Sequence, residues 1–306
     1  MTRPIVLILS LIMLAVSSCD NNSEEVPWEE NTFTTKLGRE IEIPAPNAKM
    51  LALYDQAKNN YHQDSQQIDN IIWYARRTAY LPRYLEAIDI YTKGIKMYPD
   101  EPRLYRHRGH RFISIREFDN AIADLERAAQ LIEGTENQIE PDGIPNAQGI
   151  PVSSLHGNIW YHLGLAYYLK HDLTNALEAY INCRNSHSND DNLVSSTHWL
   201  YMIQRRLGND SLALDMLDPI HSEMNIIENV SYYNLCKFYK GLIPMDSLVP
   251  DEGSAGDAVK YGLANWDLYN SDRESAKKKM EQILNGPTWN SFGYIAAESD
   301  FLQYFQ

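Results

Sequence analysis

Residues 158–183 read NIWYHLGLAYYLKHDLTNALEAYINC, and this stretch contains two consecutive helix patterns. In its first half, large and small residues recur at the spacing of one helix face: Trp160, Leu163, Gly164 and Tyr167. The second half continues with residues four and then three positions apart: Ala176, Tyr180 and Cys183. Such spacing places side chains on one face of an α-helix. The stretch therefore predicts a pair of helices that approach closely at Gly164.

The pattern of the second helix recurs along the chain. Ala121 lies 34 residues after Ala87, and further sets follow. These sets are Ala87, Tyr91 and Gly94; Ala121, Leu125 and Ala128; Ala213, Leu217 and Ile220; and Ala276, Met280 and Ile283. A first-helix pattern precedes the second set with Tyr105, Arg108, Gly109 and Phe112. A repeat of about 34 residues indicates an array of stacked helix pairs.

These motifs resemble the tetratricopeptide repeat (TPR), whose pattern runs W-x2-L-G-x2-Y, then A-x3-F-x2-A, then P. Residues 158–183 match it nearly throughout, and the unit around Ala121 matches with Arg108 in place of leucine. The resemblance covers about residues 68–220 and 257–285. It implies an all-α fold, a TPR-type solenoid of helical hairpins, across residues 51–306.

Departures from the period locate two interruptions. Between Ala121 and Ala176 there are 21 extra residues, approximately 134–154, which we call the insertion loop. Its three prolines and three glycines exclude a helix. The interval from Ala213 to Ala276 predicts a degenerate unit at about 221–256, with an extra helix at roughly 229–242.

The N-terminus resembles the signal of a bacterial lipoprotein. Residues 1–18 combine Arg3 with an apolar run and small residues, followed by Cys19. This implies cleavage before Cys19 and lipidation of its thiol, which would anchor the chain in a membrane. An ordinary secretory signal with an incidental cysteine is the alternative. The acidic run after Cys19 resembles the export signal on surface-exposed lipoproteins of the Bacteroidetes group. We therefore expect the protein in the bacterial cell envelope, lipid-anchored on the periplasmic or surface side of the outer membrane. Residues 19–50 are expected to be a lipidated flexible tether.

Composition limits the classes of function. The formal net charge of −14 disfavours nucleic-acid binding, because phosphate contacts need a basic surface. Three cysteines without close spacing favour neither a zinc site nor a disulfide framework. Cys183 and Cys236 lie on helix patterns and are expected to be buried, although a bridge between them is an alternative. No cofactor or metal is implied.

In the TPR family the first helices line a concave groove, and the resemblance implies which positions face it. The residues at these positions form the predicted groove: Arg76, Arg103, Arg106, His110, Asn158, Tyr161, Tyr168, His198 and Arg205. A basic, aromatic-lined groove would attract carboxylates. The alternative is that these are ordinary solvated helix faces. The chain does not match the carboxylate clamp of chaperone-binding repeats, because Ile72 and Arg76 stand at its first two positions.

The leading prediction is a membrane-anchored scaffold, not an enzyme, that binds a protein or peptide partner, and the basic groove favours an acidic one. One alternative is an accessory subunit of an outer-membrane uptake or secretion complex, docked by its convex face or by residues 290–305. Another is a hydrolase that uses Glu140 and Asp142 of the insertion loop, although solvated loop acids are commoner. A further hypothesis makes the loop a lid or a built-in ligand, folded across the groove through Ile139, Ile144, Ile150 and Val152.

Overall fold

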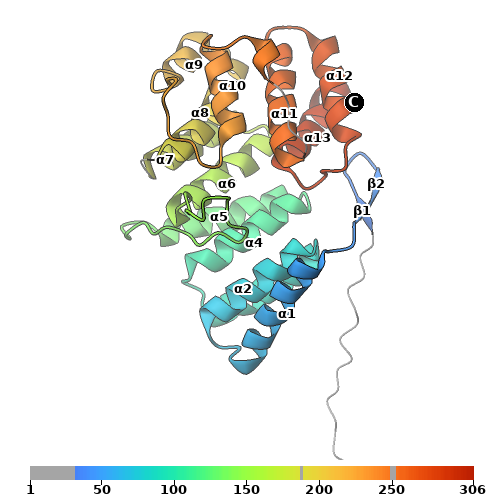
Figure 1. Ribbon diagram of the computed structural model, residues 1–306, viewed down its shortest axis with the longest axis vertical. Helices are drawn as coiled ribbons and strands as arrows, with labels where there is room; N and C mark the ends of the chain where they lie inside the picture. The colour runs from blue at the N-terminus through green and yellow to red at the C-terminus, as the bar shows by residue number, and fades with distance from the viewer. Residues whose placement is uncertain (1–31, 187–188, 249–252) are drawn as a thin grey trace, which may run out of the picture.

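The computed structural model describes residues 32–186, 189–248 and 253–306, and helices dominate these ranges (Figure 1). The helices follow one another along the chain. They are α1 (Ala48–Gln63), α2 (Ile68–Tyr80), α3 (Tyr84–Met97), α4 (Pro102–Ser114), α5 (Phe118–Leu131), α6 (Leu155–Leu169), α7 (Leu173–Ser186), α8 (Asp190–Arg206), α9 (Asp210–Met216), α10 (Val230–Tyr239), α11 (Ser254–Tyr269), α12 (Arg273–Leu284) and α13 (Phe292–Phe305), with a 3-10 turn η1 at Met245–Ser247.

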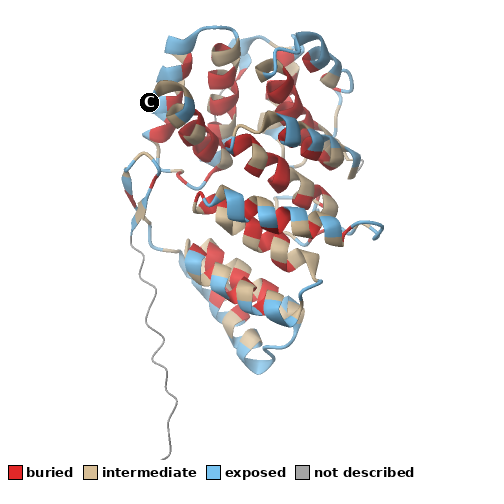
Figure 2. Cartoon of the chain, turned by 180° about the vertical axis from the view of Figure 1, so that it is seen from behind, coloured by how far each residue is buried: buried red, intermediate tan, exposed pale blue. Residues whose placement is uncertain are grey.

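The predicted repeats are confirmed as antiparallel pairs: α2 with α3, α4 with α5, α6 with α7, α8 with α9, and α11 with α12. The small residues lie where the paired helices approach most closely. A Cβ added at Gly164 would lie 2.7 Å from the Tyr180 ring, and one at Gly109 would lie 2.8 Å from Leu125. The buried residues gather on the helix faces turned toward neighbouring helices, and the exposed residues on the outer faces (Figure 2). The fold is an all-α TPR solenoid.

The chain before α1 differs from the expected flexible tether. Strands β1 (Thr32–Thr34) and β2 (Glu40–Glu42) pair antiparallel, with Phe33 opposite Ile41. This hairpin lies against the C-terminal unit, as Figure 1 shows. Phe33 stacks on Trp289 at 4.1 Å between ring centroids, and the Lys36 amide donates to Glu298 at 2.8 Å. The expectation failed because it considered only local composition. Cys19 and the segment 1–31 lie outside the described residues.

Two segments interrupt the regular succession of helix pairs. The insertion loop contains no helix, and its ends are joined by an isolated bridge between Ile139 and Ser154. The extra helix of the degenerate unit is α10. In the described part of the chain, no helix is both long enough and apolar enough to cross a membrane.

The two cysteines of the folded part are buried and free. The alternative of a Cys183–Cys236 bridge is therefore wrong for this structure. Burial raises the pKa of the Cys183 thiol to about 12 and that of Cys236 still further. A thiol needs its thiolate form to react, so both behave as small buried apolar groups.

Candidate functional site: a concave side partly covered by the insertion loop

Five residues of the predicted groove come together on the concave side. Arg76 on α2, Arg106 on α4 and Asn158 on α6 line one hollow beneath the insertion loop. Tyr161, one turn further along α6, lines the adjoining cavity, and the ring of His110 lies 4.3 Å from that of His162. These positions come from first helices of consecutive units, as the resemblance implied.

The other four residues are engaged elsewhere. Arg103 forms ion pairs with Asp69 at 2.7 Å and Glu101 at 2.8 Å, so its charge is neutralised within the chain. Arg205 pairs with Asp210 at 2.8 Å and stacks over Tyr269. Two residues are buried in the core: Tyr168 and His198.

Tyr168 and His198 are buried because later helices cover them. The Tyr168 hydroxyl receives a hydrogen bond from Tyr261 of α11 at 2.8 Å. His198 stacks between Tyr232 and Tyr239 of α10, with centroids 4.8 and 5.9 Å away. The prediction that these two residues line an accessible groove is therefore wrong.

The insertion loop crosses the concave side and fills its basic part with a carboxylate. Glu140 is only 6% exposed, which corrects the expectation of a solvated loop acid. Its carboxylate receives a 2.6 Å hydrogen bond from the Asn158 amide and lies 3.3 Å from the Arg106 guanidinium and 3.0 Å from His107 Nε2. The isoleucines do not hold the loop: Ile139, Ile144 and Ile150 are exposed, and of the expected apolar set only Val152 is buried.

Electrostatics at this point keep Glu140 ionised and His107 neutral. Burial alone would raise the pKa of Glu140, but Arg106 and His107 outweigh it and hold that pKa far below its ordinary value. Burial, together with Arg106, lowers the pKa of His107. Arg106 also lies 2.7 Å from His107 Nδ1. A guanidinium can only donate, so the neutral imidazole accepts at Nδ1 and carries its proton on Nε2, facing Glu140.

This environment does not suit acid–base catalysis. A general acid or base works best with a pKa near the working pH, and Glu140 is held far from that range. Asp142 is partly exposed, and burial is the first cause of its raised pKa. The two carboxyl groups therefore give no support to a hydrolytic site in the insertion loop.

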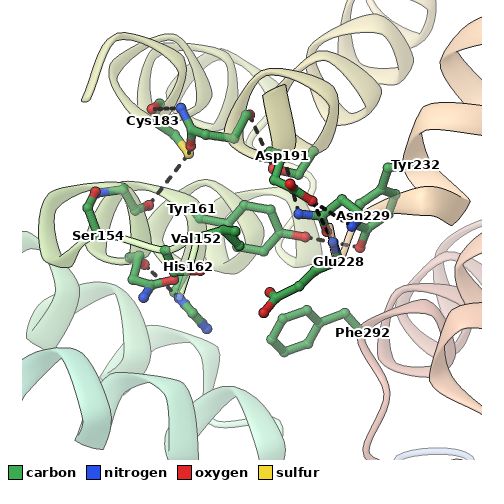
Figure 3. Close-up of a pocket in the computed structure, with 15 residues that line it drawn as sticks. Val152, Ser154, Tyr161, His162, Cys183, Asp191, Glu228, Asn229, Tyr232 and Phe292 are labelled. Carbon is green, nitrogen blue, oxygen red and sulfur yellow. Dashed lines mark hydrogen bonds between the residues drawn. The ribbon is translucent and has the colours of Figure 1, made fainter. Parts of the chain in front are cut away.

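Next to the loop lies an open cavity of about 260 Å³, which we call the central cavity (Figure 3). Its wall is built from α6, α7, α8, the segment before α10 with the first turn of α10, the end of the insertion loop and the first residue of α13. The lining residues used below are Asn158, Tyr161, His162, Glu228, Tyr232 and Phe292.

One wall of the central cavity is held by Asp191 at the start of α8. Its buried carboxylate accepts hydrogen bonds from the backbone amides of Ile227, Glu228 and Asn229, at 2.8 to 2.9 Å. Three such bonds to one charged acceptor hold the segment before α10 firmly against α8. Glu228 is thereby placed at the rim, where it accepts from the Asn146 amide of the insertion loop at 2.6 Å.

His162 lines the cavity with a ring that has one hydrogen-bond acceptor. Its Nδ1 lies 2.6 Å from the Asn158 carbonyl, which can only accept, so Nδ1 carries the proton. Burial, with Arg106 contributing, lowers the pKa of His162 to about 3. The ring is neutral, and its Nε2 remains an acceptor. Together with the Glu228 carboxylate it favours a ligand group that donates hydrogen bonds.

Aromatic rings surround this acceptor. The Phe292 ring lies 5.6 Å from that of His162, 5.3 Å from His110 and 6.2 Å from Tyr161. Tyr161 is fixed by hydrogen bonds with Trp199 at 2.9 Å and Tyr232 at 3.0 Å. The cavity can therefore hold a flat or apolar group with a donor at its tip.

Sequence reasoning missed Phe292, because it belongs to the C-terminal segment that was considered only as an external docking element. Half of that segment is buried instead: Tyr294, Ile295, Ala296 and Ala297 are each at most 1% exposed. No local signal near Phe292 indicates that its ring reaches α4 and α6. His162 and Tyr232 lay on helix patterns and were not among the predicted groove residues.

Comparison with known proteins found no matching family model and no matching curated protein. Among solved structures, the crystal structure of YrrB, described as a TPR protein with an unusual peptide-binding site, is similar at 13% identity and a TM-score of 0.44, covering 76% of this chain and 92% of that one. A putative kinesin light chain of Podosopora anserina with TPR-like repeats is similar at 14% identity and a TM-score of 0.44, covering 77% and 97%. The fold assignment rests on the helix pairs described above.

Proposed function

We propose that this protein is a scaffold that binds a segment of a partner protein on its concave side, at the central cavity. The observation that carries the proposal is the cavity itself, which gathers side chains from α6, α8, α10, α13 and the insertion loop around one hollow. A pocket with apolar walls and a few oriented polar groups is the usual form of a binding site. The reading as merely solvated helix faces does not account for the convergence of Tyr161, His162 and Phe292.

The lining favours a particular kind of partner residue. Neutral His162 and the Glu228 carboxyl group at the rim favour a hydrogen-bond donor, while Phe292 and Tyr161 favour a flat apolar group. A tyrosine, tryptophan or glutamine side chain of the partner combines these features. The expected acidic character of the partner then belongs to residues that flank this anchor and approach Arg76.

A second candidate is docking through the convex side, as in an accessory subunit of an uptake or secretion complex. It is favoured by a groove of about 620 Å³ between α5, α6 and α7, whose lining includes Trp160 and Tyr167. Aromatic residues at a surface groove are common anchors of protein interfaces.

Site-specific photo-crosslinking in the intact cell envelope separates the two candidates. A photoreactive phenylalanine analogue is placed at Val230 beside the central cavity, at Ile181 on the outer side of α7, or at Tyr304 near the C-terminus. Val230 and Ile181 are comparably exposed, at 49% and 42%, and serve as matched positions. Concave binding predicts a crosslinked partner at Val230 and none at Ile181. The reverse pattern would overturn the concave site and favour the convex one.

The anchor is a further part of the proposal. Cys19 would carry acyl chains that hold the scaffold at the outer membrane, where two or more chains give stable attachment. Labelling cells with a fatty-acid analogue is expected to mark the native chain and not a Cys19→Ala variant. Equal labelling of both chains would contradict lipidation at Cys19.

A further inference from the structure

The side chains around the Glu140 carboxylate, which we call its seat, have the composition of a carboxylate-binding site. Arg106 supplies the charge, the Asn158 amide donates at 2.6 Å, and His107 Nε2 lies 3.0 Å from the carboxylate. All three belong to the helix framework, on α4 and α6, whereas Glu140 belongs to the loop. The framework therefore forms the receptor part of this contact and the loop the ligand part.

Polar contacts hold the rest of the loop in place. Arg76 donates to the Pro141 carbonyl at 3.0 Å and Arg77 to the Gly143 carbonyl at 2.7 Å. Asn146 reaches Glu228 on the far side. The loop is thus a strap that runs from α2 to the segment before α10.

Burial of apolar side chains contributes little to the stability of the closed strap. Ile144 is 65% exposed and Ile150 is 50% exposed, so the loop can leave its seat without exposing a large apolar core. Segments with few buried apolar contacts open at lower free energy than the whole fold. One obstacle to opening is Arg106, because a buried charge without its counterion is strongly unfavourable. An incoming carboxylate removes that obstacle.

We propose that Arg106, His107 and Asn158 form a carboxylate-binding site which Glu140 fills as an internal ligand, and that an aspartate, glutamate or C-terminal carboxylate of the partner takes its place when the strap opens. The second half rests on the proposed function, whereas the first half concerns this chain alone. The strap and the partner then compete for the concave side, and the closed strap weakens binding of the partner. The apparent affinity falls by the fraction of molecules whose strap is open.

The chain itself can be tested with a Glu140→Ala variant of the full chain and N-acetylglutamate as the probe. Removing the internal carboxylate leaves the seat open, so the variant is expected to bind N-acetylglutamate at least tenfold more tightly than the native chain. Saturation should raise its Tm by about 2–4 °C, since binding to the folded state alone is stabilising. N-acetylglutamine at the same concentration and ionic strength should do neither.

The matched control is Asp142→Asn, which removes the same charge from the same loop. Asp142 makes no hydrogen bond or ion pair among the described residues, so this variant should behave as the native chain. If Glu140→Ala does not fold, Glu140→Gln keeps the side-chain length and leaves Arg106 without a counterion, and it should show the same preference for the acid. Equal responses to acid and amide in the folded variant would overturn the carboxylate site.

The competition is tested with the partner captured at Val230. It is expected to bind Glu140→Ala at least tenfold more tightly than the native chain, and Asp142→Asn unchanged. Unchanged or weaker binding to Glu140→Ala would overturn displacement by the partner. A variant that prefers N-acetylglutamate while no partner crosslinks at Val230 would instead count against the proposed function and leave the site intact.

Discussion

At the scale of single residues, buried charges in this molecule are matched in pairs across long sequence separations. Arg116 and Glu298 are each about 1% exposed and lie 2.8 Å apart. Arg116 also donates to the Trp289 carbonyl at 2.7 Å. Such a pair joins the turn between α4 and α5 to α13, so its value lies in fixing how distant parts of the chain meet.

Breaking this pair should be costly. Glu298→Ala leaves the buried Arg116 guanidinium unpaired and is expected to lower the free energy of unfolding by about 3–5 kcal/mol. Urea denaturation measures the change. The exposed pair Asp89–Lys93 is the control, and Asp89→Ala should cost less than about 1 kcal/mol. Equal costs for the two variants would contradict the structural role of the buried pair.

Buried histidines should make stability depend on pH. Burial lowers the pKa of His198 to about 3, whereas an unfolded histidine titrates near 6.5. Below pH 6.5 the unfolded chain binds more protons, so stability falls as the pH decreases toward 3. Between pH 7 and 5, His198 is expected to contribute a loss of about 2 kcal/mol.

Urea titrations at pH 7 and pH 5 test this. His198→Phe keeps the stacking on Tyr232 but removes the titrating group, so its loss on acidification should be smaller by about 2 kcal/mol. His62→Asn, at an exposed position, serves as the control and should follow the native chain. Parallel behaviour of His198→Phe and the native chain would show that His198 is not buried neutral.

At the scale of elements, some neighbouring helices meet at one point of close approach where only a glycine fits. Gly164 of α6 faces the Tyr180 ring of α7, and Gly262 of α11 faces Leu235 of α10. An alanine is ordinarily a better helix former than glycine by about 1 kcal/mol. Here that gain is opposed by overlap with a ring that is itself packed against Tyr161 and Trp199.

Gly164→Ala should therefore destabilise the protein. Overpacking of a close-packed interior typically costs about 1–3 kcal/mol, and the Tyr180 ring has little room to move. Thermal and urea unfolding give the measurement. Thr174→Ala, an exposed position on α7, should change stability by less than about 0.5 kcal/mol. A stabilised Gly164→Ala would mean that helix propensity outweighs packing at this position.

The elements themselves could be predicted because their signal is local. Gly164, Ala176 and Tyr180 lie within one helix pair, and their spacing reports which side of each helix is buried. The ion pair of Arg103 could also have been predicted, because its partner Asp69 lies 34 residues earlier, at the matching position of the preceding repeat.

The site could be predicted only in part. Positions on first helices identify the groove of an open solenoid, and Arg76, Arg106 and Asn158 fit that description. Tyr168 and His198 do not, because α11 and α10 cover them. Glu140 and Phe292 reach the concave side from a loop and from the last helix, and such long-range closure leaves no periodic trace in the sequence.

At the scale of the whole molecule, the hairpin connects the beginning of the described chain to its end. Phe33 packs on Trp289, and the Arg116 guanidinium lies 4.8 Å from the centre of the Phe33 ring. One core cluster accordingly includes Ile41, at the start, and Ala297, near the end. In an open array each unit touches only its neighbours, and local units can unfold separately.

Removing the contact should loosen the far end of the chain. Phe33→Ala is expected to speed backbone hydrogen exchange in α12 and α13, at least tenfold, while α2 and α3 change little. Mass spectrometry of the exchanged peptides measures both regions at once. Leu51→Ala, an exposed position on α1, is the control. Unchanged exchange in α13 would show that the hairpin rests on the C-terminal unit without holding it.

The hairpin also has an evolutionary consequence. Solenoids commonly vary in length, since duplication of a unit only adds another turn to an open stack. Here an additional unit would move α13 away from the hairpin, separating Phe33 from Trp289 and Lys36 from Glu298. It would also withdraw the Phe292 ring from α4 and α6. Selection for the cavity is therefore selection for the number of units, and descendants of this chain should diverge in their loops before they gain or lose a repeat.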